Sequence, residues 1–261
     1  MNGYDNEYHF VLAINNKRIK DLDPLCRDLI IKILHGVSDS IMLKAWRNHY
    51  KQKNDVMIKV GGILKGISIK MGSRNSIHVE KLEEFICFLR KLGISDDMID
   101  VYKKYHYADG TIDGSGNKRL SSEEFKLLYQ KDIDRLNLLL NTKENIATAV
   151  SRFVLYGHYS LHSIDALVYG TPNDFLFLLP DEITNIHLKN KDNYSTGVHF
   201  GNLFVQPLGR NLKRSSSGEY ARSFVQIKWY SLFDDIIWHM NDRQQADYVG
   251  SNNYEKKELI K

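Results

Sequence analysis

Residues 54–70, NDVMIKVGGILKGISIK, decide the fold of the surrounding region. Two short runs rich in apolar residues, Val56–Val60 and Gly66–Lys70, lie on either side of the pair Gly61-Gly62. Glycine adopts the backbone conformations that a tight hairpin turn requires, and the flanking runs have the composition of strands. This stretch therefore predicts a β-hairpin.

Polar groups gather at the open end of this predicted hairpin. Asp55 stands at the start of its first strand, while Ser68 and Lys70 close the second and share one face because strand side chains alternate. Pairing of the strands can bring Asp55 close to Lys70, and Glu80, at the start of a predicted helix over residues 79–92, can lean over the strand ends. Two carboxylates and a lysine suit metal-assisted hydrolysis of a phosphodiester, in which oxygen ligands hold Mg²⁺ and the lysine orients or deprotonates water.

The charge around the hairpin is strongly basic. Residues 44–79 contain eight lysines and arginines and one acid, Asp55, in a chain whose net charge is only +4. A second basic stretch contains Arg210, Lys213, Arg214, Arg222 and Lys228 against Glu219. Two such segments could line one nucleic-acid surface, although two solvated lysine-rich faces remain an alternative interpretation.

The order of elements over residues 22–92 resembles the core of the PD-(D/E)xK nuclease superfamily, which includes many type II restriction endonucleases. Asn54 stands where that pattern has proline, and Ser68 where it has Asp or Glu. One branch of restriction endonucleases keeps Ser-x-Lys on the strand and places the second carboxylate on the next helix, and Ser68-Ile69-Lys70 followed by Glu80 is similar. The resemblance implies Asp55, Ser68, Lys70 and Glu80 as catalytic residues, with Asp55 and Glu80 holding Mg²⁺ or Mn²⁺.

The resemblance also implies a function and partners. It suggests a divalent-metal-dependent endonuclease of a restriction or phage-defence system, acting on double-stranded DNA as a homodimer, with a cognate methyltransferase as a possible companion. The expected DNA contacts are Arg74, Asn75, His78, Arg210, Arg214, Arg222 and Lys228.

Three alternatives stay open. Pro180-Asp181 with Gln226 and Lys228 forms a second, looser nuclease-like set, so Asp181, Gln226 and Lys228 are an alternative site. The chain could also be a non-catalytic nucleic-acid-binding protein on a degenerate nuclease fold. A third reading is an enzyme with another substrate, whose basic segments serve solubility.

The wider chain predicts an α/β (α+β) fold. We expect a nuclease-like core, a small mixed sheet flanked by helices, in residues 1–114. A helical, then β-rich region in residues 115–261 is expected to serve DNA recognition and dimerisation, and the two regions form either two domains or one. The expected early elements are a strand over Tyr8–Ile14, a helix from Pro24 to Gly36 and a helix over Ser38–Tyr50. The expected later elements are helices capped near Ser121 and starting at Asn145, and strands over Asp174–Leu179, His199–Val205 and Ser223–Trp229.

Composition excludes several classes. Apolar residues make up 43 % of the 261 residues, and no run approaches the roughly 18 apolar residues of a membrane span, so we expect no membrane association. Cys26 and Cys87 are expected to be buried thiols of a cytoplasmic protein. Residues 109–117 imitate half an EF-hand, but Leu120 stands where the bidentate glutamate is needed, which favours a structural loop. P-loop, nucleophile-elbow and clustered zinc-ligand motifs are absent from the sequence.

Overall fold

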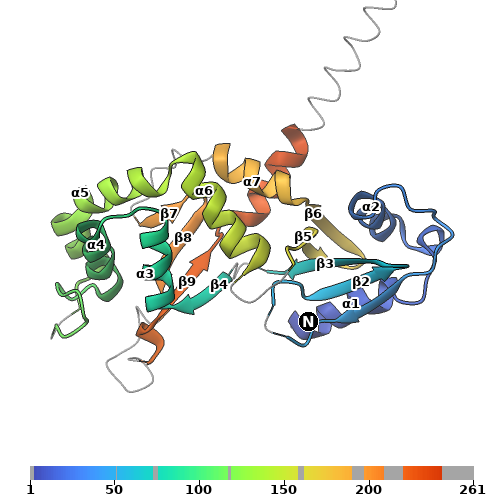
Figure 1. Cartoon of the computed structure of the whole chain (residues 1–261), viewed down its shortest axis with the longest axis horizontal. Helices are drawn as coiled ribbons and strands as arrows, with labels where there is room; N and C mark the ends of the chain where they lie inside the picture. Colours follow the sequence, from blue (N-terminus) through green and yellow to red (C-terminus); the bar gives the residue numbers. More distant parts are fainter. Residues whose placement is uncertain are drawn as a thin grey trace, which may run out of the picture.

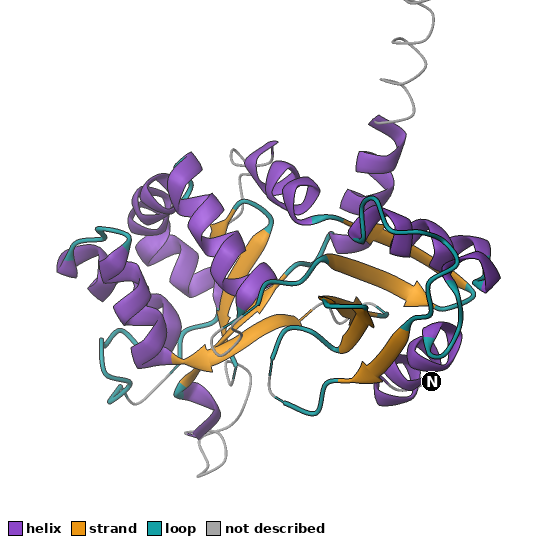
Figure 2. Ribbon diagram, turned by 45° about the vertical axis from the view of Figure 1, so that its right-hand side comes forward, coloured by secondary structure: helices purple, strands orange, loops and turns teal. Residues whose placement is uncertain are grey.

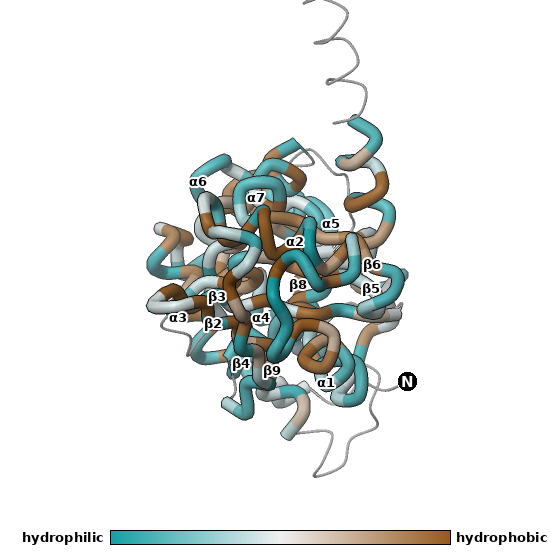
Figure 3. Tube along the Cα trace, turned by 90° about the vertical axis from the view of Figure 1, so that its right-hand side faces the viewer, coloured by the Kyte–Doolittle hydropathy of each residue, from teal (hydrophilic) through white to brown (hydrophobic). Residues whose placement is uncertain are grey.

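The computed structural model describes residues 3–50, 52–72, 76–116, 119–157, 162–189, 197–208 and 220–242. These residues form two sheets of five and four strands with helices around them, which confirms the expected mixed α+β class. Figure 2 shows the two groups of strands, each with its own helices. Along the helices, hydrophobic and hydrophilic segments alternate, as in amphipathic helices that cover a core (Figure 3).

The five-stranded sheet contains the predicted hairpin. Its order is β1 (Lys44–Arg47), β2 (Val56–Val60), β3 (Ile63–Lys70), β5 (Ala166–Thr171) and β6 (Asp174–Leu178). Val60 pairs with Ile63 across the glycine turn, where Gly61 has a φ of 55°. The pairs are antiparallel except β3 with β5, which run parallel although about a hundred residues separate them.

Two helices cover one face of this sheet (Figure 1). They are α1 (Gly3–Ile14) and α2 (Pro24–Ile33), where the Asp23 side chain caps α2 as its Asp-Pro start predicts; the short turn η1 (Ile19–Asp21) lies between them. We call α1, α2 and this sheet the hairpin unit. Its core is formed by Phe10, Ile14, Leu29, Ile30, Val56, Ile58, Ile67 and Val168, among others.

The four-stranded sheet is antiparallel throughout. Its order is β4 (Ser76–Lys81), β9 (Phe224–Lys228), β8 (Leu203–Pro207) and β7 (Val198–Phe200). The surrounding helical elements are α3 (Leu82–Lys91), α4 (Asp96–Tyr107), α5 (Ser122–Leu140), α6 (Lys143–Val150), the π-helical turn η2 (Ser151–Tyr156) and α7 (Pro180–Lys189). We call this assembly the antiparallel unit. Its core includes the fully buried rings of Phe85, Tyr102, Phe153, Phe200 and Trp229.

The chain passes back and forth between the two units. It leaves the hairpin unit after β3, returns for β5 and β6, and leaves again at α7. Leu167 and Leu178 of the mixed sheet belong to the larger core, so the second face of that sheet packs against the antiparallel unit. The expected boundary after residue 114 does not match this division, because α4 and α5 pack against each other on either side of it.

Two early expectations are wrong. Residues 8–14 belong to helix α1 rather than a strand, because Asn6, Phe10 and Ile14 recur at helical spacing and are buried together. Residues 38–50 are mostly loop around the strand β1, since residues 44–47 pair with β2 and this non-local pairing outweighs helix propensity. The later strands and the Ser121–Glu124 capping box are confirmed, with His199–Val205 divided between β7 and β8.

The two cysteines differ in environment. Cys26 is buried in the hairpin unit, where burial raises the pKa of its thiol to about 11, whereas Cys87 is exposed and the expectation that it is buried is wrong. Cys87 lies on α3, away from the face that contacts the core. Across the described ranges, no helix is both long and apolar enough to span a membrane.

Candidate active site

Asp55, Ser68 and Lys70 form one connected polar group at the open end of the hairpin. Asp55 Oδ2 accepts hydrogen bonds from Ser68 Oγ (3.0 Å) and from the Ile69 backbone N–H (2.6 Å). Lys70 Nζ donates to Ser68 Oγ and to the Ile69 carbonyl, each at 3.1 Å, and lies 3.6 Å from Asp55 Oδ2. The structure thus brings together three of the four residues expected to be catalytic.

The backbone fixes this geometry. The Asp55 N–H donates to the Ile67 carbonyl, and the Asp55 carbonyl accepts from the Asn48 N–H, so the peptide of Asp55 is held on both sides. The register that pairs Val56 with Ile67 then places Asp55 beside Ser68. The side chains of Asp55 and Lys70 remain 23 % and 22 % exposed, so a substrate can reach both charged groups.

Asn54 has its own structural role where the nuclease pattern has proline. Its side chain is buried against Gly66, and a Cβ atom at Gly66 would lie 2.1 Å from Asn54 Oδ1. Asn54 Nδ2 also donates to the carbonyl of His162, in the segment that leads into β5. Asn54, which replaces the proline of the nuclease pattern, therefore connects the start of β2 to β3 and to the segment that precedes β5.

Sequence reasoning missed Glu7. Helix α1 places this carboxylate at the same end of the sheet, where Arg47 Nε donates to Glu7 Oε2 at 3.1 Å and the side chain is 21 % exposed. Burial and then the negative charge of Asp55 raise the pKa of Glu7, against the opposing effects of Arg47 and Lys70. Glu7 is thus electrostatically coupled to the Asp55–Lys70 pair. A helical reading of residues 3–14, from the buried spacing of Asn6, Phe10 and Ile14, could have found it.

Glu80 lies in a different environment from the one expected. It belongs to strand β4, not to the start of a helix, and its side chain is 1 % exposed. Arg152 Nη2 (2.6 Å) and His78 Nε2 (3.2 Å) contact Glu80 Oε2, and these partners outweigh burial and hold the pKa of Glu80 below its usual value. Within the described residues, no contact joins Glu80 to Asp55, Ser68 or Lys70. The expected sharing of a metal by Asp55 and Glu80 therefore does not fit this geometry.

Lys53 lies between the two carboxylate environments. Its Nζ donates to the Ile77 carbonyl on β4, and its aliphatic stem packs where a Cβ at Gly157 would lie. Burial, followed by repulsion from Lys70, lowers the pKa of Lys53 to about 7, although Asp55 and Glu80 oppose the shift. This lysine links the hairpin unit to the antiparallel unit directly beside Asp55.

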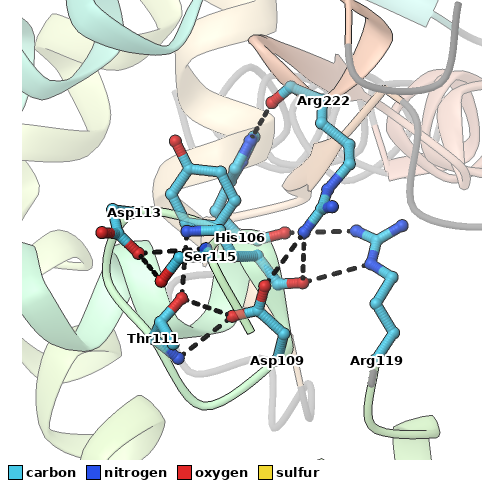
Figure 4. Close-up of polar contacts among 9 residues, drawn as sticks. His106, Asp109, Thr111, Asp113, Ser115, Arg119 and Arg222 are labelled. Atoms are coloured by element: carbon cyan, nitrogen blue, oxygen red, sulfur yellow. Dashed lines mark hydrogen bonds and ion pairs between the residues drawn. The ribbon is translucent and has the colours of Figure 1, made fainter. Parts of the chain in front are cut away.

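Arg222, one of the expected DNA contacts, is a buried structural residue. Its guanidinium donates to Asp109 Oδ2 (3.2 Å) and to the Tyr107 carbonyl (3.4 Å), and it is 5 % exposed. Figure 4 shows Arg222 and Arg119 directed toward the loop after α4, in which the Asp109 and Asp113 carboxylates accept bonds from Thr111 and Ser115. The carboxylates of the loop are thus engaged by Thr111, Ser115 and Arg222, as expected of a structural loop.

The other expected DNA contacts fall into three groups. His78 is 8 % exposed, held between Glu80 and the ring of Phe153, so it is closed to a DNA base. Lys228 lies on β9 with its ammonium 5.3 Å from the centre of the Tyr230 ring. The remaining four, Arg74, Asn75, Arg210 and Arg214, lie outside the described residues.

The alternative site is not assembled. Pro180-Asp181 opens helix α7 rather than a strand, because proline is favoured in the first helical turn. Gln226 accepts from Gln206 and donates to Ser76 on the neighbouring strands. In the part of the chain that the structure describes, no contact joins Asp181 to Gln226 or Lys228, so these residues do not form a catalytic set.

Comparison with known proteins adds no assignment: no protein-family model matches the chain, and a search of the curated proteins finds no match either. The interpretation of the site therefore depends on its geometry and chemistry.

The hairpin end offers a limited set of metal ligands. Among the described residues, no three His, Cys, Asp or Glu side chains are arranged to hold a metal ion. Mg²⁺, however, needs only one or two carboxylates, because water and substrate phosphate oxygens fill its other positions. The contacts of Asp55 in the described residues all go to Oδ2, which leaves Oδ1 for a cation, and Glu7 is the second carboxylate coupled to this position. These carboxylate oxygens are of the type that a hard divalent cation prefers.

Proposed function

We propose that this chain is a divalent-metal-dependent endonuclease that hydrolyses DNA phosphodiester bonds, on a core that resembles the PD-(D/E)xK nucleases. The observation that carries the proposal is the hydrogen-bonded chain from Lys70 Nζ through Ser68 Oγ to Asp55 Oδ2, at paired strand ends and open to solvent. A carboxylate and an ammonium held 3.6 Å apart on rigid strands form a pre-organised site.

Each side chain has a role in the proposed reaction. Asp55 Oδ1 and Glu7 would hold Mg²⁺ or Mn²⁺, which when bound would neutralise phosphate charge and lower the pKa of a water. Lys70 is oriented by Ser68 Oγ and the Ile69 carbonyl, so its positive charge is fixed where a phosphate oxygen gains negative charge. Ser68 orients both neighbours. We assign the second ligand to Glu7 rather than to Glu80, which is committed to Arg152 and His78.

The finer parts of the proposal concern substrate and biology. The basic residues of segment 44–79 surround the site in sequence and favour a polyanionic substrate, for which we propose double-stranded DNA. A role in restriction or phage defence, action as a homodimer and a companion methyltransferase follow from the resemblance alone and belong to the same proposal.

Cleavage of supercoiled plasmid tests the proposal. With Mg²⁺ the wild-type chain should nick and linearise the plasmid, and with EDTA it should not. Lys70→Ala should reduce the rate by about 100-fold or more, because a fixed charge in the transition state is lost. Lys65→Ala is the matched control, since Lys65 lies on the same strand, pairs with Asp165 and is similarly exposed.

Equal plasmid cleavage by the wild type and by an Asp55→Ala/Lys70→Ala double variant would refute the assignment. Single-stranded DNA and RNA of the same sequence, added as substrates in parallel, distinguish a DNA endonuclease from a ribonuclease.

One observation favours a second candidate, a nucleic-acid-binding protein without catalysis. Ser68 replaces the acid of the nuclease pattern, and Asp55 Oδ2 already has Ser68, Ile69 and Lys70 around it. Salt-dependent DNA binding without cleavage in Mg²⁺ or Mn²⁺ would support this candidate over the first.

A further inference from the structure

Helix α5 carries an apolar strip that no other described segment covers. Leu127 and Leu138 are 88 % and 76 % exposed, and Leu128 and Leu139 beside them are exposed as well. The opposite side of α5 supplies Phe125, Ile133, Leu136 and Leu140 to the core. The exposed leucines are therefore not the core-facing side of the helix. Exposed leucines grouped on one face mark an interaction surface.

The strip is self-complementary both in its leucine positions and in its charges. Residues 127, 131, 134 and 138 follow one another at steps of four, three and four, so Leu127, Lys131, Asp134 and Leu138 form one line along the helix. Lys131 and Asp134, between the leucines, are both exposed. When a second copy of α5 runs antiparallel, Leu127 meets Leu138 of that copy and Lys131 meets Asp134. Each contact then occurs twice, as two-fold symmetry requires.

Charge also selects this register over the adjacent one. A shift of one residue would still pair leucines, Leu127 with Leu139 and Leu128 with Leu138, but would place Lys131 against Arg135. Like charges that face each other across an interface disfavour that arrangement. The sequence of α5 thus supports one antiparallel arrangement and opposes its nearest competitor.

We propose that two copies of this chain associate through α5, packed antiparallel about a two-fold axis that passes between Asp132 and Ile133. The inference depends on the surface of α5 and not on the proposed nuclease activity. Figure 1 shows α5 at the outer end of the antiparallel unit, away from the hairpin unit. Association through this helix therefore leaves Asp55 and Lys70 accessible on each copy.

Sedimentation equilibrium of the full chain tests the proposal. We expect a concentration-dependent dimer with a Kd on the order of micromolar, because one helix pair is a small interface. Leu127→Glu/Leu138→Glu should raise the Kd by about 100-fold or more, since four buried leucines are replaced by charges. Ile31→Glu is the matched control: it replaces an exposed apolar residue on α2, in the other unit, and should leave the Kd unchanged. Circular dichroism melts verify that all variants are folded.

A charge exchange tests the antiparallel pairing itself. Lys131→Glu alone should weaken the dimer by about tenfold, because it sets two acids against each other twice, whereas Lys131→Asp/Asp134→Lys should restore wild-type association. If Lys131→Asp/Asp134→Lys does not restore association, the proposed antiparallel pairing of Lys131 with Asp134 is wrong. The proposal is wrong if the wild-type chain stays monomeric up to about 200 µM, or if Leu127→Glu/Leu138→Glu does not change the Kd of the dimer. In either case the apolar strip would bind a different partner.

Discussion

Asp55 and Glu80 are two carboxylates with nearby cations and opposite environments. Asp55 lies 3.6 Å from Lys70 with about a quarter of its side chain exposed, whereas Glu80 lies 2.6 Å from Arg152 and is almost completely enclosed. Lys53 interacts with both carboxylates electrostatically and joins the two regions. The two ion pairs therefore differ in access: a ligand can reach the open one, while the enclosed one joins strand β4 to the turn η2.

The largest expected effect is on the enclosed pair. Glu80→Ala should lower the free energy of unfolding by about 3–5 kcal/mol, because it removes a buried carboxylate from its ion pair with Arg152 and its contact with His78. Asp55→Asn should cost only about 1 kcal/mol, since its partners remain partly solvated. Urea unfolding measures both values. A Glu80→Ala chain that is as stable as the wild type but fails to cleave DNA would show that Glu80 has a catalytic role. The distinction drawn between Asp55 and Glu80 would then be wrong.

The open site should be sensitive to packing behind it. Gly66→Ala should destabilise the chain by about 2–3 kcal/mol and reduce cleavage, because the new Cβ would overlap Asn54, the residue directly before Asp55. Gly62→Ala, in the turn of the same hairpin, has open space around it and should be nearly neutral. Thermal melts and plasmid cleavage of both variants test this, and equal behaviour of the two would contradict the packing argument.

The antiparallel unit should lose stability in acid. His187 is fully buried against Trp229, its Nδ1 accepts from the Asn202 N–H, and burial lowers its pKa to about 3. The unfolded chain protonates this histidine near pH 6.5 and the folded chain does not, so its contribution is complete above pH 6.5. Below that pH the contribution falls by about 1.4 kcal/mol per unit until about pH 3. Urea unfolding from pH 7.5 to 5 should show that the free energy of unfolding of His187→Asn depends less on pH than that of the wild type. If the two chains lose stability equally as the pH falls, His187 is not the source of the acid sensitivity.

The smallest expected effect tests whether Glu7 is the second ligand of the metal ion. Under the proposed function, Glu7→Gln should raise the Mg²⁺ concentration for half-maximal cleavage by about tenfold, because one negative ligand is lost. Stability should change little, since Glu7 is partly exposed. Asp5→Asn, on the same turn of α1 and exposed, is the control. A Mg²⁺ requirement unaffected by Glu7→Gln would mean that Glu7 is not a ligand.

Local signals predicted the fold well where neighbouring residues decide it. The Gly61-Gly62 turn, the start of α2 at Pro24 and the helix cap at Ser121 were all correctly predicted, because each depends on contacts within a few residues. The geometry of Asp55, Ser68 and Lys70 followed from the hairpin register for the same reason.

The features that could not be predicted from the sequence depend on contacts between residues far apart in the chain. Residues 76–81 form strand β4 because they pair with β9, almost 150 residues later, and this moves Glu80 off the expected helix and into a buried ion pair. Glu7 was overlooked because residues 8–14 were predicted to form a strand. They belong instead to helix α1, which contains Glu7 and buries Asn6, Phe10 and Ile14. Arg222 looked like a surface cation until its pairing with Asp109, more than a hundred residues earlier, placed it inside.

The parallel pairing of β3 with β5 also has a consequence during synthesis. The hairpin can close as soon as residue 70 leaves the ribosome, yet its partner strand begins at residue 166. For about a hundred residues of translation, the β3 edge is without the strand that later protects it, and unprotected edges pair with other chains. Aggregation of nascent chains is therefore most expected for fragments that stop between residues 70 and 166, and slower translation of this interval should increase dependence on chaperones.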